Sequence, residues 1–87
     1  MDEHESVIET AKQLKVKRVG LIILGDSWDY PLSWRLYRMG FEVRHVTSVD
    51  LSWADILYAD FLYSAEAAAI KDWPLSGSAF INPRLLK

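Results

Sequence analysis

Apolar side chains follow two patterns along this chain, and the clearer one is an almost continuous run at Val19–Leu24. A strand covered on both faces has this pattern, because neither face needs polar side chains. Gly25 ends the run. Pro31 then suits the first turn of a helix, where its missing N–H costs nothing, and Phe41–Val49 is predicted to be a second strand. The stretch Val16–Val46 is therefore predicted to form one βαβ unit.

Helical spacing of apolar residues appears on both sides of that first strand. Asp2–Leu14 has apolar side chains every three or four residues, which predicts an amphipathic helix. The helix between the two strands is predicted over Pro31–Met39. Gly40 fits the left-handed position that closes such a helix.

The middle of the chain leaves two interpretations open. Asp50 or Ser52 can begin a helix that runs to about Tyr58, and Asp60–Tyr63 is then a short strand. Alternatively, Ile56–Tyr63 forms one longer strand. The period does not separate the two, because the run is apolar throughout.

The last third predicts a helix followed by a final strand. Ala65–Ile70 strongly favours a helix, with Ser64 as its N-cap. Trp73-Pro74 ends that helix, since the residue before proline avoids the helical region. Leu75–Gly77 is predicted to be a turn and Ser78–Asn82 the last strand.

The alternation of strands and helices determines the expected fold class. Strands separated by helices need crossover connections, and right-handed crossovers produce a parallel sheet. We expect residues 1–87 to form one α/β domain of the Rossmann or flavodoxin type. It is predicted to be a three-layer sandwich whose parallel sheet has about four strands in the order 2-1-3-4.

The composition excludes several classes of function. With no cysteine the chain has neither a disulfide nor a catalytic thiol, and a cytoplasmic protein is expected. A net charge of −2 lacks the basic footprint of a nucleic-acid-binding protein. The longest apolar runs are far below the roughly 20 residues that cross a bilayer. His4 and His45 have no second ligand at metal spacing, so neither a metal nor another cofactor is expected.

The aromatic content is high for so short a chain, with 13% Phe, Trp and Tyr and four Trp. Large aromatic side chains dominate both protein cores and protein interfaces. This is more aromatic surface than one small core needs, so we predict that some of these residues contact a partner protein or a second copy of the chain. The predicted interface residues are Trp28, Tyr30, Trp34, Trp53 and Trp73.

Polar residues gather directly after the first predicted strand. In open parallel sheets, ligands bind beyond the carboxyl ends of the strands, where the strand order reverses. The candidate residues for a small ligand are therefore Gly25, Asp26, Ser27, Asp29 and, at the end of the last strand, Asn82. The alternative interpretation is a tight turn, in which glycine supplies the conformation and Asp and Ser cap the next helix.

The turn after the first predicted strand resembles one known catalytic motif and lacks a known cofactor-binding motif. Gly25-Asp26-Ser27 after an apolar strand resembles the nucleophile block of the GDSL (SGNH) hydrolases, which would make Ser27 the nucleophile of an ester hydrolase. That family also has an Asp-x-x-His segment near the C-terminus, which this chain lacks, and serine is inert without a positioned base. The glycine motif of dinucleotide-binding Rossmann folds, G-x-G-x-x-G, is also missing. No complete catalytic set is predicted.

A third resemblance covers most of the chain. The βαβ opening, Glu66 on a helix and the strand that ends in Ile81-Asn82-Pro83 resemble the N-terminal, pre-ATP-grasp domain of ATP-grasp ligases. The resemblance implies a substrate- or nucleotide-binding role, and the ATP-grasp domains themselves are not in this sequence. The preferred prediction is a small non-catalytic α/β module that associates with a protein partner or with itself. The ligase-like binding domain is the alternative.

Overall fold

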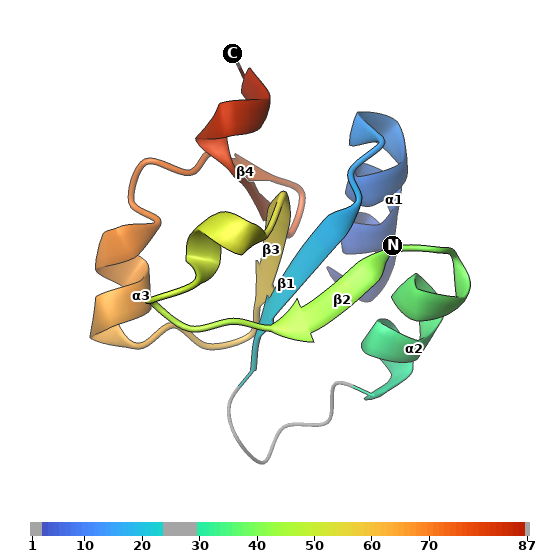
Figure 1. The fold of residues 1–87 in the computed structure, drawn as a ribbon, viewed down its shortest axis with the longest axis horizontal. Helices are drawn as coiled ribbons and strands as arrows, with labels where there is room; N and C mark the ends of the chain where they lie inside the picture. The colour runs from blue at the N-terminus through green and yellow to red at the C-terminus, as the bar shows by residue number, and fades with distance from the viewer. Residues whose placement is uncertain (1–2, 24–29, 87) are drawn as a thin grey trace.

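A mixed sheet lies at the centre of the molecule, with five strands in the order β2-β1-β3-β5-β4 (Figure 1). The computed structural model describes residues 3–23 and 30–86 of the chain. In chain order its elements are α1 (Glu3–Leu14), β1 (Arg18–Ile22), α2 (Tyr30–Arg38), β2 (Glu42–His45), the 3-10 turn η1 (Leu51–Trp53), β3 (Ile56–Ala59), α3 (Ser64–Ala69), β4 (Leu75–Ser76), β5 (Ala79–Ile81) and the 3-10 turn η2 (Pro83–Leu86).

The first three strands are parallel, whereas the last two alternate in direction. β1 pairs in parallel with both β2 and β3, which confirms the predicted order of these three strands. β5 runs antiparallel to β3 and to β4. The predicted last strand, Ser78–Asn82, corresponds to β5 and lies beside β3, as the predicted order 2-1-3-4 requires. The all-parallel sheet of about four strands is wrong, because β5 runs antiparallel and β4 is a fifth strand.

A hairpin explains this reversal. β4 runs in the same direction as β3, as a strand that follows a crossover helix should, because both are antiparallel to β5. The chain then turns over Gly77 and Ser78, with Gly77 at a φ of 61°, and β5 returns between β3 and β4. The sequence predicts only a turn at Leu75–Gly77, because a strand as short as β4 shows no alternating pattern.

The helix predicted from Asp50 or Ser52 to about Tyr58 is wrong, and so is the separate strand Asp60–Tyr63. Only the short turn η1 forms, and β3 begins at Ile56, as in the alternative interpretation, but it ends at Ala59. Successive residues of β3 are buried on opposite faces of the sheet, so the run is apolar throughout without being helical.

The second strand is shorter than the predicted Phe41–Val49, because Asp50 turns the chain. The Asp50 carboxylate accepts a hydrogen bond from the Thr47 N–H at 2.6 Å, and the Asp50 N–H donates to the Thr47 carbonyl at 3.2 Å. Gly40, at a φ of 95°, has the left-handed conformation that the sequence predicted after the second helix.

The described elements form three layers. α1 and α2 cover one face of the sheet, and η1 and α3 cover the other (Figure 1). Residues of β1 alternate between the two cores. The first core includes Val7, Ile8, Ala11, Val19, Leu21, Leu32, Leu36, Ile56, Tyr58 and Ala79, and the second includes Ile22, Val46, Leu51, Ala54, Leu57 and Ile70.

Gly20, in the middle of β1, lets the second layer approach the sheet closely. A Cβ atom at this position would lie 2.7 Å from a methyl group of Leu57, 2.9 Å from the Cβ of Ala54 and 3.0 Å from a methyl group of Val46. The Ala54 Cβ is fixed to the backbone, so a larger residue would displace η1 or bend β1.

We therefore predict that Gly20→Ala destabilises the domain by about 1–3 kcal/mol, the usual cost of overpacking a close-packed core. Urea unfolding followed by circular dichroism measures this change. Ser76→Thr adds one methyl group at an exposed strand position and is the control, with an expected change within about 0.5 kcal/mol. Equal stabilities for the Gly20→Ala variant and the unsubstituted chain would contradict the close approach.

Candidate functional site

The carboxyl ends of the parallel strands meet at one edge of the sheet, where the strand order reverses. The chain passes from β1 to β2 through α2 on one face, and from β2 to β3 through η1 on the other. The switch point therefore lies between β1 and β3, beside Ile22 and Ala59. Gly25, Asp26, Ser27, Trp28 and Asp29, the residues that follow β1, lie outside the described residues.

Asn82 lies at the opposite end of the sheet. Because β5 is antiparallel to β3, Ile81 is opposite Ile56, the first residue of β3. The buried Asn82 side chain donates from Nδ2 to the Ala54 carbonyl at 2.9 Å and accepts at Oδ1 from the Arg84 N–H at 3.1 Å. The structure thus does not bring Asn82 together with the point where the chain leaves β1.

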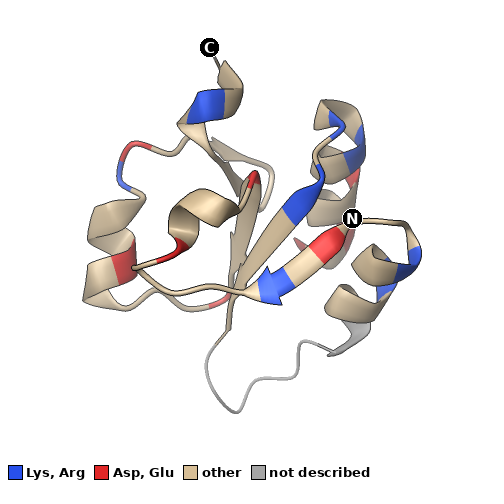
Figure 2. Ribbon diagram, in the orientation of Figure 1, with Lys and Arg blue, Asp and Glu red and all other residues tan. Residues whose placement is uncertain are grey.

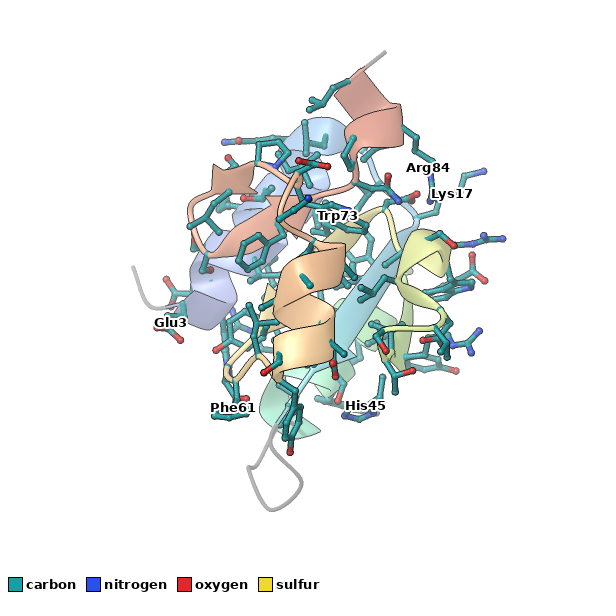
Figure 3. The ribbon with its side chains drawn as sticks, turned by 90° about the vertical axis from the view of Figure 1, so that its left-hand side faces the viewer. Glu3, Lys17, His45, Phe61, Trp73 and Arg84 are labelled. Carbon is teal, nitrogen blue, oxygen red and sulfur yellow. The ribbon has the colours of Figure 1, made fainter. Side chains whose placement is uncertain are left out.

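Asp55 is the centre of the polar cluster beside Asn82, and sequence reasoning missed it. Its carboxylate accepts hydrogen bonds from the backbone N–H groups of Lys17 and Arg18 at 2.9 and 3.0 Å. It also forms an ion pair with Arg84, whose guanidinium donates further to backbone carbonyls of η1. Figure 3 shows Arg84 and Lys17 at the same end of the molecule, with His45 and Phe61 at the other end.

The environment of Asp55 lowers the pKa of its carboxyl group. Burial alone would raise the pKa of this carboxyl group. The hydrogen bonds from the Lys17 N–H, the Arg84 side chain and the Arg18 N–H outweigh burial and hold the Asp55 pKa below its usual range. The cluster therefore keeps a charged carboxylate at the ends of three strands, where it has a structural role.

Replacing this carboxylate gives a pH-dependent prediction. A lowered folded-state pKa contributes stability that is present above the unfolded value of about 3.9 and is lost as the pH falls through the folded value. We expect Asp55→Asn to lower the free energy of unfolding by about 1–3 kcal/mol at neutral pH, as for other hydrogen bonds to charged groups. The difference should shrink below about pH 4.

Urea unfolding at several pH values measures this effect, and the exposed Asp72 supplies the matched control. Asp72→Asn should change stability little at any pH. A difference between Asp55→Asn and the unsubstituted chain that stays constant down to the lowest pH would contradict the role assigned to the carboxylate.

The aromatic residues predicted to form an interface lie in different places. Trp34 is 47% exposed on α2, where the Arg38 guanidinium lies 5.6 Å from its ring centre. Trp53 is half-buried, with Arg44 4.9 Å and Arg18 5.7 Å from its ring. Trp73 packs half-buried against the second core. The side chain of Tyr30 lies outside the described part, as Trp28 does.

Trp73 and Asn82 line the same open hollow of about 490 Å³ beneath η1, together with Pro83 and Arg84. The structure thus brings together one residue predicted for an interface and one predicted for a ligand. The polar atoms of Asn82 and Arg84 are already bound to the backbone and to Asp55, so the hollow gains little binding chemistry from them.

A groove of about 570 Å³ follows the outer edge of the sheet, and we call it the β2 groove. Five consecutive residues line it, 40–44, the last three of which belong to β2, and rings from both faces of the sheet flank it. Tyr37 of α2 stands on one side and Trp53 of η1 on the other. The lining residues are Tyr37, Gly40, Phe41, Glu42, Val43, Arg44 and Trp53.

The described residues form neither a metal site nor a helix that could cross a bilayer. Across residues 3–23 and 30–86, no three His, Asp or Glu side chains come close enough to hold a metal ion. His4 packs edge-to-face on Tyr58 with ring centres 5.5 Å apart, whereas His45 lies on β2. No helix in the described part of the chain has the length and apolar character needed to cross a bilayer.

Comparisons with protein-family models, with curated proteins and with solved structures found no significant match to this chain. The resemblance to the pre-ATP-grasp domain is therefore still a prediction from the sequence.

Proposed function

We propose that this domain is a non-catalytic association module that binds a second copy of itself through the β2 groove. The observation that carries the proposal is an edge strand lying in an open groove between two aromatic rings. An exposed strand edge presents backbone N–H and C=O groups that can pair with another strand. The other edge of the sheet, β4, has only 2 residues and offers much less to pair with.

Exposed apolar side chains on α2 and directly after it support this choice of surface. Tyr37 is 71% exposed, Trp34 47% and Met39 43%. Tyr and Trp are the residues that most often dominate binding energy at protein interfaces. Trp34 and Tyr37 also line a smaller hollow of about 270 Å³ against Val43 and His45, so the aromatic surface is continuous with β2.

The charges on β2 favour an identical partner. Figure 2 shows an acidic and a basic band on this strand, which are Glu42 and Arg44. Both side chains are largely exposed and form surface ion pairs within the chain, Glu42 with Arg18 at 3.7 Å and Arg44 with Asp50 at 3.3 Å. A strand that carries both signs can complement a second copy of itself.

Light scattering after size exclusion tests the proposal. We expect a mass of twice the 10.0 kDa of one chain at high concentration, with dissociation on dilution. Tyr37→Ala should raise the dimer dissociation constant about tenfold, since truncating an aromatic residue at an interface commonly costs more than 1 kcal/mol. Tyr63→Ala removes an exposed ring outside the β2 groove and is the control. A chain that stays monomeric at every concentration would contradict the proposal.

The switch point between β1 and β3 favours a second candidate function, binding of a nucleotide or an amino acid. Open α/β sheets bind ligands at this position, and Asp26, Ser27 and Asp29 follow β1 in the sequence. In this candidate the domain would be the substrate-side part of a ligase-like enzyme.

NMR titration with ATP, Mg²⁺ and amino acids tests this second candidate. We expect the amide signals of Ile22, Ile23 and residues 25–29 to shift on addition of the ligand, while Asn82 at the other end of the sheet stays unchanged. The unchanged spectrum of Asn82 serves as the internal control. The absence of any shift after β1 would exclude this candidate for these ligands.

A further inference from the structure

The hydrogen bonds of β2 determine which of its backbone groups face the groove. The Glu42 and Val46 N–H groups donate to the carbonyls of Lys17 and Leu21 at 2.8 and 3.0 Å. In a parallel ladder successive residues alternate in direction, so the N–H and C=O of Val43 point away from β1. Val43 is the outward-facing residue between Glu42 and Arg44, so a strand added across this part of the edge pairs through Val43.

Charge then selects one of the three arrangements of two β2 strands that are centred on Glu42, Val43 or Arg44. When two residues face each other across an antiparallel pair, either both direct their backbone N–H and C=O groups toward the partner strand or both direct them away from it. In a pairing centred on Glu42, the Glu42 side chains of the two copies are directly opposite each other. In a pairing centred on Arg44, the two Arg44 side chains are opposite each other. Like charges directly opposite are destabilising. Pairing centred on Val43 places Glu42 opposite Arg44 of the second copy, and by symmetry does so twice.

We infer that two copies of this chain pair β2 with β2 in antiparallel orientation, about a two-fold axis at Val43. This inference rests on the proposed function and adds the register of the interface. The two sheets become one continuous sheet, with α2 of both copies on the same face. Tyr37 of each copy then stands beside the joint.

In this arrangement, charged side chains form a continuous row on the face of the sheet that α2 does not cover. Glu42 already pairs with Arg18, and Arg44 with Asp50. Across the joint Glu42 gains Arg44 of the second copy, so four charges of alternating sign follow one another. Arg44 and Arg18 also flank the Trp53 ring, which holds this row close to the surface of η1.

Charge reversal tests whether these residues face each other. Glu42→Arg alone and Arg44→Glu alone each place like charges opposite each other, and each should raise the dimer dissociation constant about tenfold. An equimolar mixture of the two variants restores both opposite pairs and should associate at least as well as the unsubstituted chain. A mixture no stronger than either variant alone would overturn the inference.

Single cysteine variants test the register, and the chain has no cysteine of its own to interfere. At the two-fold axis the Cα atoms of Val43 and its copy are about 5.5 Å apart, within the range of a disulfide. In the same register the two copies of residue 42 are roughly 8 Å apart, and so are those of residue 44, which is too far. Under oxidation we expect Val43→Cys to form a covalent dimer, whereas Glu42→Cys and Arg44→Cys should not.

The outcomes separate this inference from the proposed function. A chain that is monomeric by light scattering overturns both. A dimer that is cross-linked through residue 42 or 44, or through none of the three, overturns the register and leaves self-association standing. If Val43→Cys does not fold, amide exchange of the unsubstituted chain decides the matter. The Val43 N–H should be protected on dimerisation, and unchanged exchange at Val43 in the dimer would overturn the register.

Discussion

The two central strands have to be covered on both faces by a chain of only 87 residues, and most of the structure follows from this constraint. The two longer helices, α1 and α2, cover one face, which leaves only η1 and the six-residue α3 for the other. A thin second layer excludes water only if it lies close to the sheet. Gly20 allows that close approach. Among the described elements none pairs with the outer edge of β2, and the groove lies there.

The sequence predicts the first half of the fold well, because that half has strong and local signals. The apolar run of β1, the proline at the start of α2 and the left-handed Gly40 each have one physical interpretation. The second half is less predictable because its elements are short. β3 is buried on both faces, so its pattern resembles that of a buried helix, and β4 is too short to have a pattern. The direction of β5 depends on that missed hairpin.

The candidate site was predictable only in part. Of the aromatic residues predicted for an interface, Trp34 is exposed and Trp53 and Trp73 are half-buried, and Trp34 and Trp53 are on or beside the β2 groove. The sequence does not show which edge of the sheet they flank, because that depends on strand order. The importance of Tyr37 was missed for the same reason. Asp55 gave no signal at all, since its partners Lys17, Arg18 and Arg84 are distant in the sequence.

The contacts of β5 also bear on the order in which the protein is made. Ser78, just before β5, donates from its hydroxyl to the Glu3 carbonyl at the start of α1, and its N–H donates to the Ser6 hydroxyl. The first helix is thus held by a hairpin that leaves the ribosome long after it. Until synthesis has passed Arg84, the nascent chain lacks both this anchor and the cation that balances Asp55. α1 and Asp55 therefore acquire these partners only after residues 78–84 have been translated.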